Sequence, residues 1–179
     1  MKVLALDLAT TTGAAVGIPG AAPKLFTERF GDPDENHLVR FSRCLNWINL
    51  MIKEHQPTVI AIEEPIASGV VGKKDRIFLA AGYRGCVLGV AGMRKLRLEE
   101  YSVSQIRKHF IGTSTLKRKQ AKETVLRECL SRGWKASNDN EGDAAALFDF
   151  VLAKNGFQVE PNGLFGGNTY EHPNSRRGA

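Results

Sequence analysis

Three acidic residues in this sequence stand where segments of regular structure are expected to begin or end. Asp7 follows the apolar run Val3–Leu6, and Glu63 ends the β-branched run that starts at Thr58. Asp143 falls in the first turns of an alanine-rich segment with helical character. Turn formation or capping is the structural alternative for each acid, but a carboxylate at the end of a buried strand is costly unless it is paired or holds a cation.

The chemistry of these residues favours a divalent metal. Strand ends at one edge of an open α/β sheet meet in a crevice, so the three carboxylates are expected to converge there. Like charges at close range raise each other's pKa, whereas a bound cation turns this repulsion into coordination. Because the donors are all oxygens, with no His or Cys nearby, Mg²⁺ or Mn²⁺ is favoured over zinc.

The elements that position these acids follow from the hydrophobic pattern. Apolar residues at spacings of three and four predict a helix over 36–54, and short β-branched or alternating runs predict strands. This order predicts an α/β fold with an antiparallel start and parallel additions, and a flexible tail over 155–179. The expected strands are 3–7, 14–18, 22–30, 58–63 and 94–101, and the expected helices are 36–54, 75–92, 102–110, 116–132 and 141–152.

The overall composition says less about the function than the acidic residues do. The 179 residues carry a formal charge of +6 with a pI near 9.4, which suits a polyanionic partner without requiring one. Cys44, Cys86 and Cys129 are odd in number and widely spaced, so we expect reduced thiols and neither a disulfide framework nor a zinc site. No long apolar span or cleavable leader is visible, so a cytoplasmic protein with no membrane partner is expected.

Five segments together resemble the RuvC-type Holliday junction resolvases of the RNase H-like superfamily, a family with phage and prophage-type members to which this chain could belong. The acidic motifs are LALDLATTTG, VIAIEEP and DNEGDAAAL, and the segments YRGCVLGVAG and YSVSQIRKHFIGTSTLKRKQAKETV are similar to that family's central helix and basic stretch. The resemblance runs from Met1 to Lys154. It implies an RNase H-like nuclease domain over 1–154, with a mixed five-stranded sheet flanked by helices.

The resemblance implies that Asp7, Glu63 and Asp143 are catalytic metal ligands. The family commonly places a fourth acid three residues before the last, but Asn140 stands there in this chain. Asp139, four residues before Asp143, is our choice for the fourth acid, and Glu141 is the second choice. Two Mg²⁺ ions, with Mn²⁺ as a substitute, are then expected to activate the attacking water and to stabilise the leaving 3′ oxygen.

Several basic residues are candidates for contacts with DNA phosphates, although a solvated helix face is the alternative for such a run. Phe78 and Tyr83 could stack on unpaired bases, with core packing favoured for both. The candidate phosphate-binding residues are Lys73, Lys74, Arg76, Lys117, Arg118, Lys119 and Lys122.

The predicted activity is cleavage of four-way or otherwise branched DNA. The alternatives are another RNase H-like nuclease, acting on RNA in hybrids or on branched DNA generally, and a junction-binding protein without catalysis. A homodimer is expected, because paired nicks in a two-fold junction need two sites. Its candidate interface is the glycine-rich helix with Gly82, Gly85 and Gly89. The sequence identifies no helicase partner.

Overall fold

Five strands form one mixed sheet, as the sequence predicts. The computed structural model describes residues 1–32, 34–64, 74–159 and 170–171, and in it the strand order is β3-β2-β1-β4-β5. β1 is antiparallel to β2, and β2 to β3, whereas β4 is parallel to both β1 and β5. The strands are β1 (Val3–Asp7), β2 (Thr11–Gly17), β3 (Lys24–Arg29), β4 (Val59–Glu63) and β5 (Arg97–Tyr101).

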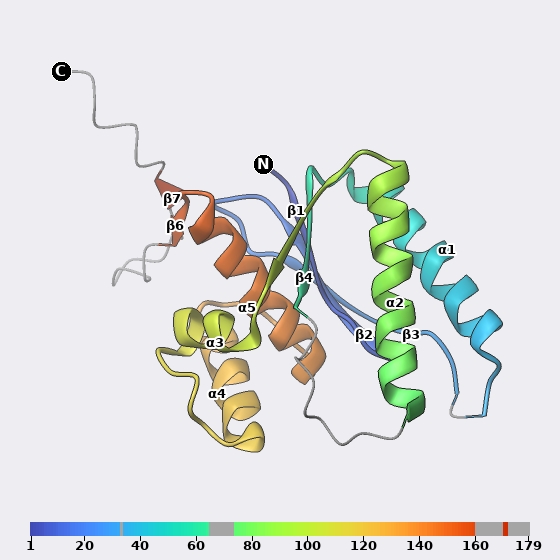
Figure 1. Cartoon of the computed structure of the whole chain (residues 1–179). Coiled ribbons are helices and arrows are strands. Elements are labelled where there is room, and N and C mark those ends of the chain that lie inside the picture. Colours follow the sequence, from blue (N-terminus) through green and yellow to red (C-terminus); the bar gives the residue numbers. More distant parts are fainter. Residues whose placement is uncertain (33, 65–73, 160–169, 172–179) are drawn as a thin grey trace.

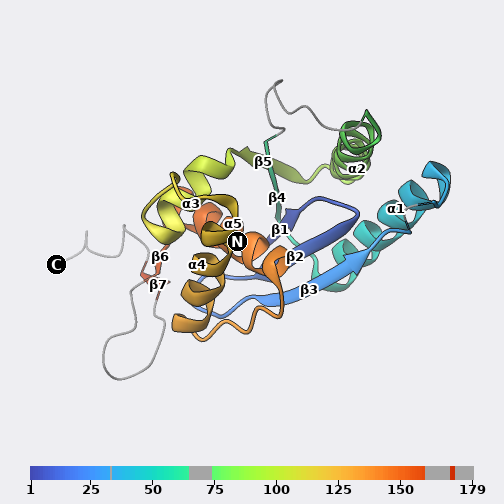
Figure 2. The same cartoon turned by 90° about the horizontal axis from the view of Figure 1, so that it is seen from below.

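Helices cover both faces of this sheet. In Figures 1 and 2, α1 and α2 lie on one side of the strands and α3, α4 and α5 on the other. The three layers explain why β1 and β4 are apolar without alternation, since both of their faces are buried. The helices are α1 (His37–His55), α2 (Lys74–Met93), α3 (Val103–Ile111), α4 (Arg118–Ser131) and α5 (Asp139–Lys154).

Successive residues of the central strands point into different cores. Leu4 and Ile60 pack into the cluster under α1 and α2, whereas Ala5 and Ala61 pack into the cluster under α5. Burying one Leu or Ile side chain stabilises a fold by about 2 kcal/mol, so a one-residue slip of β1 would be strongly opposed. The register of the strands therefore fixes the face on which every later residue of each strand lies.

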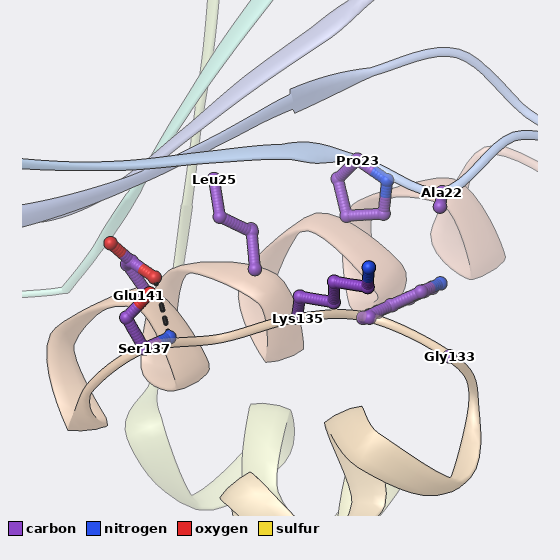
Figure 3. A pocket seen from close by; sticks show the side chains of 8 residues that line it. Ala22, Pro23, Leu25, Gly133, Lys135, Ser137 and Glu141 are labelled. Atoms are coloured by element: carbon purple, nitrogen blue, oxygen red, sulfur yellow. Dashed lines mark hydrogen bonds between the residues drawn. The ribbon is translucent and has the colours of Figure 1, made fainter.

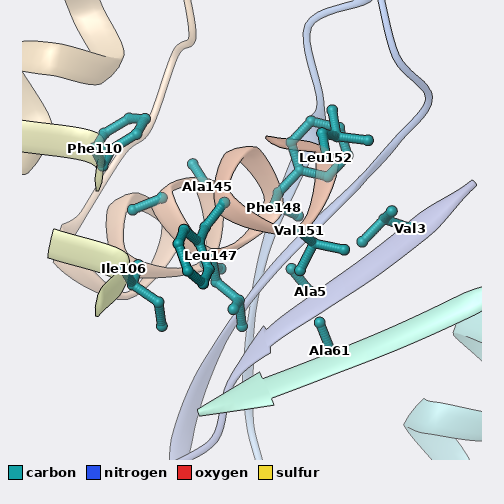
Figure 4. Packing of buried hydrophobic residues seen from close by; sticks show 14 of the residues in the cluster. Val3, Ala5, Ala61, Ile106, Phe110, Ala145, Leu147, Phe148, Val151 and Leu152 are labelled. Atoms are coloured by element: carbon teal, nitrogen blue, oxygen red, sulfur yellow. The ribbon is translucent and has the colours of Figure 1, made fainter. Parts of the chain in front are cut away.

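Helix α5 is the most deeply buried helix and crosses β1 and β2 at close range (Figure 4). Its small residues Ala144, Ala145 and Ala146 are buried, which lets the helix backbone approach the sheet. Gly13 of β2 sits beneath the first turn of the helix, where a Cβ atom would overlap the Asn140 carbonyl. The sequence places Gly13 in a turn, whereas the structure places it in a strand, paired with Asp7.

Local capping signals define where the helices begin. Asn36 caps α1 by accepting a hydrogen bond from the Leu38 N–H at 2.8 Å. Ser102 and Gln105 form a reciprocal capping box at the start of α3. The predicted helix and strand limits agree with the structure to within a few residues.

The last part of the chain contains one feature that the sequence does not predict. Gln158–Val159 (β6) pairs antiparallel with Tyr170–Glu171 (β7) in a separate two-stranded ladder. For residues 65–74, PIASGVVGKK, the sequence predicts a basic, glycine-containing loop, and of these residues only Lys74, the first residue of α2, lies within the described part of the chain. Among the described residues, no helix has the length and apolar character needed to cross a membrane. The three cysteines are free thiols.

Candidate active site

The register of β1 against β4 brings the first two predicted acids together. Leu6 pairs with Ile62, so Asp7 and Glu63 are next to each other across neighbouring strands, which are about 4.8 Å apart in sheets. Leu6 and Ile62 face α1 and α2. Because side chains alternate along a strand, Asp7 and Glu63 face the opposite side, toward α5.

The first turns of α5 supply the other two acids. Asp139 and Asp143 are four residues apart and so lie on one side of the helix. Asn138 fixes where the helix begins, because its side chain accepts a hydrogen bond from the Glu141 N–H at 3.0 Å. This cap and the contact at Gly13 place the N-terminal end of α5 over the ends of β1 and β4.

Three of the acids have pKa values above their ordinary values. Burial, followed by the charges of Glu63 and Asp143, raises the pKa of Asp7 well above its ordinary value. Burial and the charge of Asp143 raise the pKa of Glu63 to about 7. The pKa of Asp143 is also raised, mainly by burial. Asp7, Glu63 and Asp143 therefore form one electrostatically coupled cluster, named the acid triad below.

Asp139 behaves differently from the acid triad. Lys122 of α4 donates a hydrogen bond to its carboxylate, and this bond lowers the pKa of Asp139. The sequence predicts Lys122 as a phosphate contact, but the structure places its ammonium group within the acidic cluster. Lys122 also partly offsets the effects that raise the pKa values of Asp7 and Glu63.

Arg107 of α3 is a site residue that the sequence prediction missed. Its positive charge opposes the increase in the pKa of both Glu63 and Asp143, so it lies close to them. Its Nε is buried and has no hydrogen-bond partner among the described residues. The sequence carries one signal that could have identified Arg107. It lies three residues before the buried Phe110 and directly after the buried Ile106, so a charged side chain is expected near the inner face of α3.

Glu141, the second choice for the fourth acid, is not part of this cluster. Its carboxylate accepts hydrogen bonds from Thr27 Oγ1 of β3 at 2.8 Å and from the Ser137 N–H at 2.7 Å. It lines a pocket of about 290 Å³ beside Leu25 and Lys135, as Figure 3 shows. The acid triad does not line this pocket, and the hydrogen bonds of Glu141 direct its carboxylate toward Thr27 and Ser137.

The other basic residues predicted to contact DNA lie in two parts of the chain, the beginning of α4 and the beginning of α2. Lys117, Arg118 and Lys119 are exposed at the beginning of α4 and are named the basic segment below. Arg118 is close enough to Asp143 to oppose the increase in its pKa. Lys73 lies outside the described residues, and only the backbone is described for Lys74 and Arg76.

The two aromatic residues considered for base stacking differ in their burial. Tyr83 is fully buried and packs on Phe30 and Phe41, with ring centroids 5.2 and 5.5 Å away. The favoured interpretation, core packing, is therefore correct for Tyr83. Phe78 is 55% exposed and lies against His37, with 4.9 Å between ring centroids.

The donor set of the acid triad fits a hard divalent cation. The three residues offer only carboxylate oxygens, and burial together with neighbouring negative charge raises their pKa values, effects that a bound cation would offset. In the conformation described for residues 1–32, 34–64 and 74–159, no three His, Cys, Asp or Glu side chains converge tightly enough to enclose an ion.

The sheet order, the helices on both faces and the acids at one sheet edge define the RNase H-like class of folds. Thermus thermophilus RuvC has the same fold, with a TM-score of 0.64 and 18% identity over 87% of this chain and 97% of that one. T. thermophilus RuvC in complex with a Holliday junction substrate gives a TM-score of 0.65 and 19% identity over 82% of this chain and 90% of that one.

The family model for the crossover junction endodeoxyribonuclease RuvC matches residues 32–148. The chain belongs to the RuvC family. It is 29% identical over 101 residues to the crossover junction endodeoxyribonuclease RuvC of Nitrosomonas eutropha. That match spans 56% of this chain and about half, 52%, of the relative's length.

Proposed function

We propose that this protein is a metal-dependent endonuclease that cuts four-way or branched DNA junctions. The observation that carries the proposal is the acid triad, in which strands β1 and β4 and helix α5 each contribute one partly or fully desolvated carboxylate. Such a cluster is destabilising without a positive partner, so its presence in a member of the RuvC family supports catalysis rather than junction binding alone.

The residues of the site have distinct proposed roles. Asp7, Glu63 and Asp143 would hold the divalent ions, with Asp139 as a further ligand when Lys122 releases it. Bound Mg²⁺ or Mn²⁺ would supply the positive charge that activates water and stabilises the leaving oxygen. Two ions per site are proposed.

Two cations of the chain are suited to the phosphate being cut. The buried Nε of Arg107 has no hydrogen-bond partner in the part of the chain that the structure describes, and guanidinium groups recognise phosphate oxygens well. Lys122 is bonded to Asp139 in this structure and could transfer its hydrogen bond to the phosphate when DNA arrives. Both groups would stabilise the extra negative charge of the transition state.

The basic segment would bind the DNA backbone farther from the cut. Its three side chains are exposed, and Lys119 makes a long contact of 4.0 Å with Glu123. These cations are therefore available to neutralise phosphates. Contacts of this kind orient a duplex but carry little sequence information.

The proposal is tested by offering the protein three substrates side by side in Mg²⁺. They are a four-way DNA junction, an RNA–DNA hybrid and a linear duplex of the same sequence. We expect paired nicks in the junction, much slower cutting of the other two, and no cutting in excess EDTA. Preferred cleavage of the hybrid would indicate a different RNase H-like activity. Tight junction binding without any cleavage would indicate a binding protein.

We also propose that two copies associate through α2. Gly85 and Gly89 have open space where a side chain would project, and Leu88 beside them is 40% exposed. Gly82 must be removed from the predicted interface, because a Cβ there would overlap Phe41 of α1 in the same chain. The glycines therefore serve two purposes: one permits α1 to pack, and the others leave an open helix face.

Sedimentation of the wild type and of Gly85→Arg, with and without a four-way junction, tests the dimer. The control variant is Leu130→Arg, which adds the same charge at a 73% exposed position on α4. We expect Gly85→Arg alone to be monomeric and to lose paired nicking. A monomeric wild type in both conditions would contradict the dimer.

A further inference from the structure

A buried carboxylate outside the acid triad lies where α3, α4 and α5 meet. Asp149 of α5 has a side chain that is only 2% exposed. Nε2 of His109, on α3, lies 2.9 Å from its Oδ2, and Nη1 of Arg132, the residue that caps α4, lies 2.9 Å from the same oxygen. Asp149 therefore connects three helices through one oxygen atom.

Both partners of Asp149 are themselves held in place. Nε of Arg132 donates to Glu128 Oε1 at 2.7 Å, and its guanidinium lies 4.4 Å from the centre of the Phe110 ring. The His109 ring lies 5.4 Å from the ring centre of Phe150 in an edge-on arrangement. The carboxylate thus sits in a fixed frame, with one partner on each neighbouring helix.

The link to α3 is the one that bears on the active site. His109 is two residues beyond Arg107 on the same short helix, so holding His109 also holds the helix backbone from which the Arg107 side chain projects. On α5, Asp149 lies six residues beyond Asp143, about 9 Å along the helix axis. The Asp149–His109 contact therefore joins the helix that carries Arg107 to the helix that carries Asp143.

Buried ion pairs contribute little net stability compared with apolar residues of the same size, so a purely stabilising role explains this cluster poorly. We propose that Asp149 is a positioning residue, which acts through His109 to hold α3 so that Arg107 faces the acid triad. This inference rests on the proposed junction cleavage. It assigns to Asp149 no contact with DNA or metal.

The test compares two variants that break the link from opposite ends, Asp149→Asn and His109→Ala. The control is Glu100→Gln, since the Glu100 side chain is 26% exposed and pairs with Arg84 of α2, on the opposite face of the sheet from α3, α4 and α5. We expect both link variants to cut a four-way junction about tenfold more slowly, with the dissociation constant for the junction changed less than twofold. The control should match the wild type.

A double-variant experiment separates positioning from general destabilisation. Asp149→Asn introduced into Arg107→Ala should slow cleavage by less than a further factor of two, because the group that it positions is already absent. A full further tenfold loss would overturn the inference. Unchanged cleavage in both link variants, when the wild type is active, would overturn it as well.

A second readout does not depend on cleavage. The side-chain Nε–Hε resonance of Arg107, assigned from its loss in Arg107→Ala, should shift in both link variants and stay in place in Glu100→Gln. An unmoved resonance overturns the inference. If the wild type cuts no junction, the proposed function fails, and this resonance still decides whether Asp149 positions Arg107.

Discussion

Replacing Glu63 by Gln should stabilise the metal-free protein at neutral and alkaline pH. The folded chain raises the pKa of Glu63 to about 7 from an ordinary value of 4.5, mainly because the carboxyl is buried. Folding therefore favours the protonated form of this group. The wild type loses stability as pH rises through about 7, and a Gln side chain, which cannot ionise, avoids that loss.

The size of the effect follows from the pKa difference. At about 1.36 kcal/mol per pKa unit, the difference corresponds to about 3 kcal/mol above pH 7. Because Glu63 retains partial contact with water and its charge is coupled to Asp7, we expect an observed gain of about 1 to 3 kcal/mol at pH 8. Near pH 4.5 and below, the part of the stability difference between the two proteins that comes from the shifted pKa should vanish.

The assay is urea unfolding of both proteins at pH 4.5, 6 and 8 in EDTA, and again at pH 8 with Mg²⁺. The control is Glu123→Gln, a 58% exposed carboxylate on α4, which should change the unfolding free energy by less than about 0.5 kcal/mol at every pH. Added Mg²⁺ should stabilise the wild type and not the Glu63→Gln variant. A variant that is less stable than the wild type at pH 8 in EDTA would refute the reasoning.

Three further predictions follow from the same structure. Gly13→Ala should displace the first turn of α5, and so destabilise the fold by about 1 to 3 kcal/mol in urea unfolding and slow junction cleavage. Wild-type stability together with a wild-type cleavage rate would contradict the packing argument. Replacing the basic segment (Lys117–Lys119) by Ala should reduce the slope of log K against log salt by about 0.9 per lost phosphate contact, and an unchanged slope would make it only a solvated face. Ca²⁺ should support junction binding without cleavage, so rapid cutting in Ca²⁺ would contradict the proposed metal requirement.

Much of the scaffold could be predicted because its signals are local. The apolar runs before Asp7 and Glu63 identify two buried strands, and the periodic pattern over 36–54 identifies α1. The pairing of strands depends on contacts between residues that are farther apart in the sequence. The sequence predicts Gly13 in a turn because three threonines precede it, and only the contact with α5 shows why a glycine is needed within the strand.

The residues that surround the acid triad were harder to predict, since their roles depend on distances between helices. Lys122 looks like one cation in a basic run, yet packing of α4 on α5 turns it toward Asp139. Arg107 falls within the segment that resembles the family's basic stretch, but only the packing of α3 shows that its charge acts on the triad. Glu141 looks like an acid of the right type, but its bonds to Thr27 and Ser137 direct it toward β3.

The most direct test of the central claim compares cleavage and binding of a four-way junction by the wild type and by Asp7→Asn in Mg²⁺. Asp7 is the acid whose environment least favours an uncompensated charge, and Asn keeps its shape while removing that charge. The proposed site predicts that Asp7→Asn binds the junction within about threefold of the wild type and shows no measurable cleavage, which corresponds to a loss of about 4 kcal/mol or more in transition-state stabilisation. Cleavage by Asp7→Asn at the wild-type rate would contradict the assignment of the acid triad as the catalytic centre.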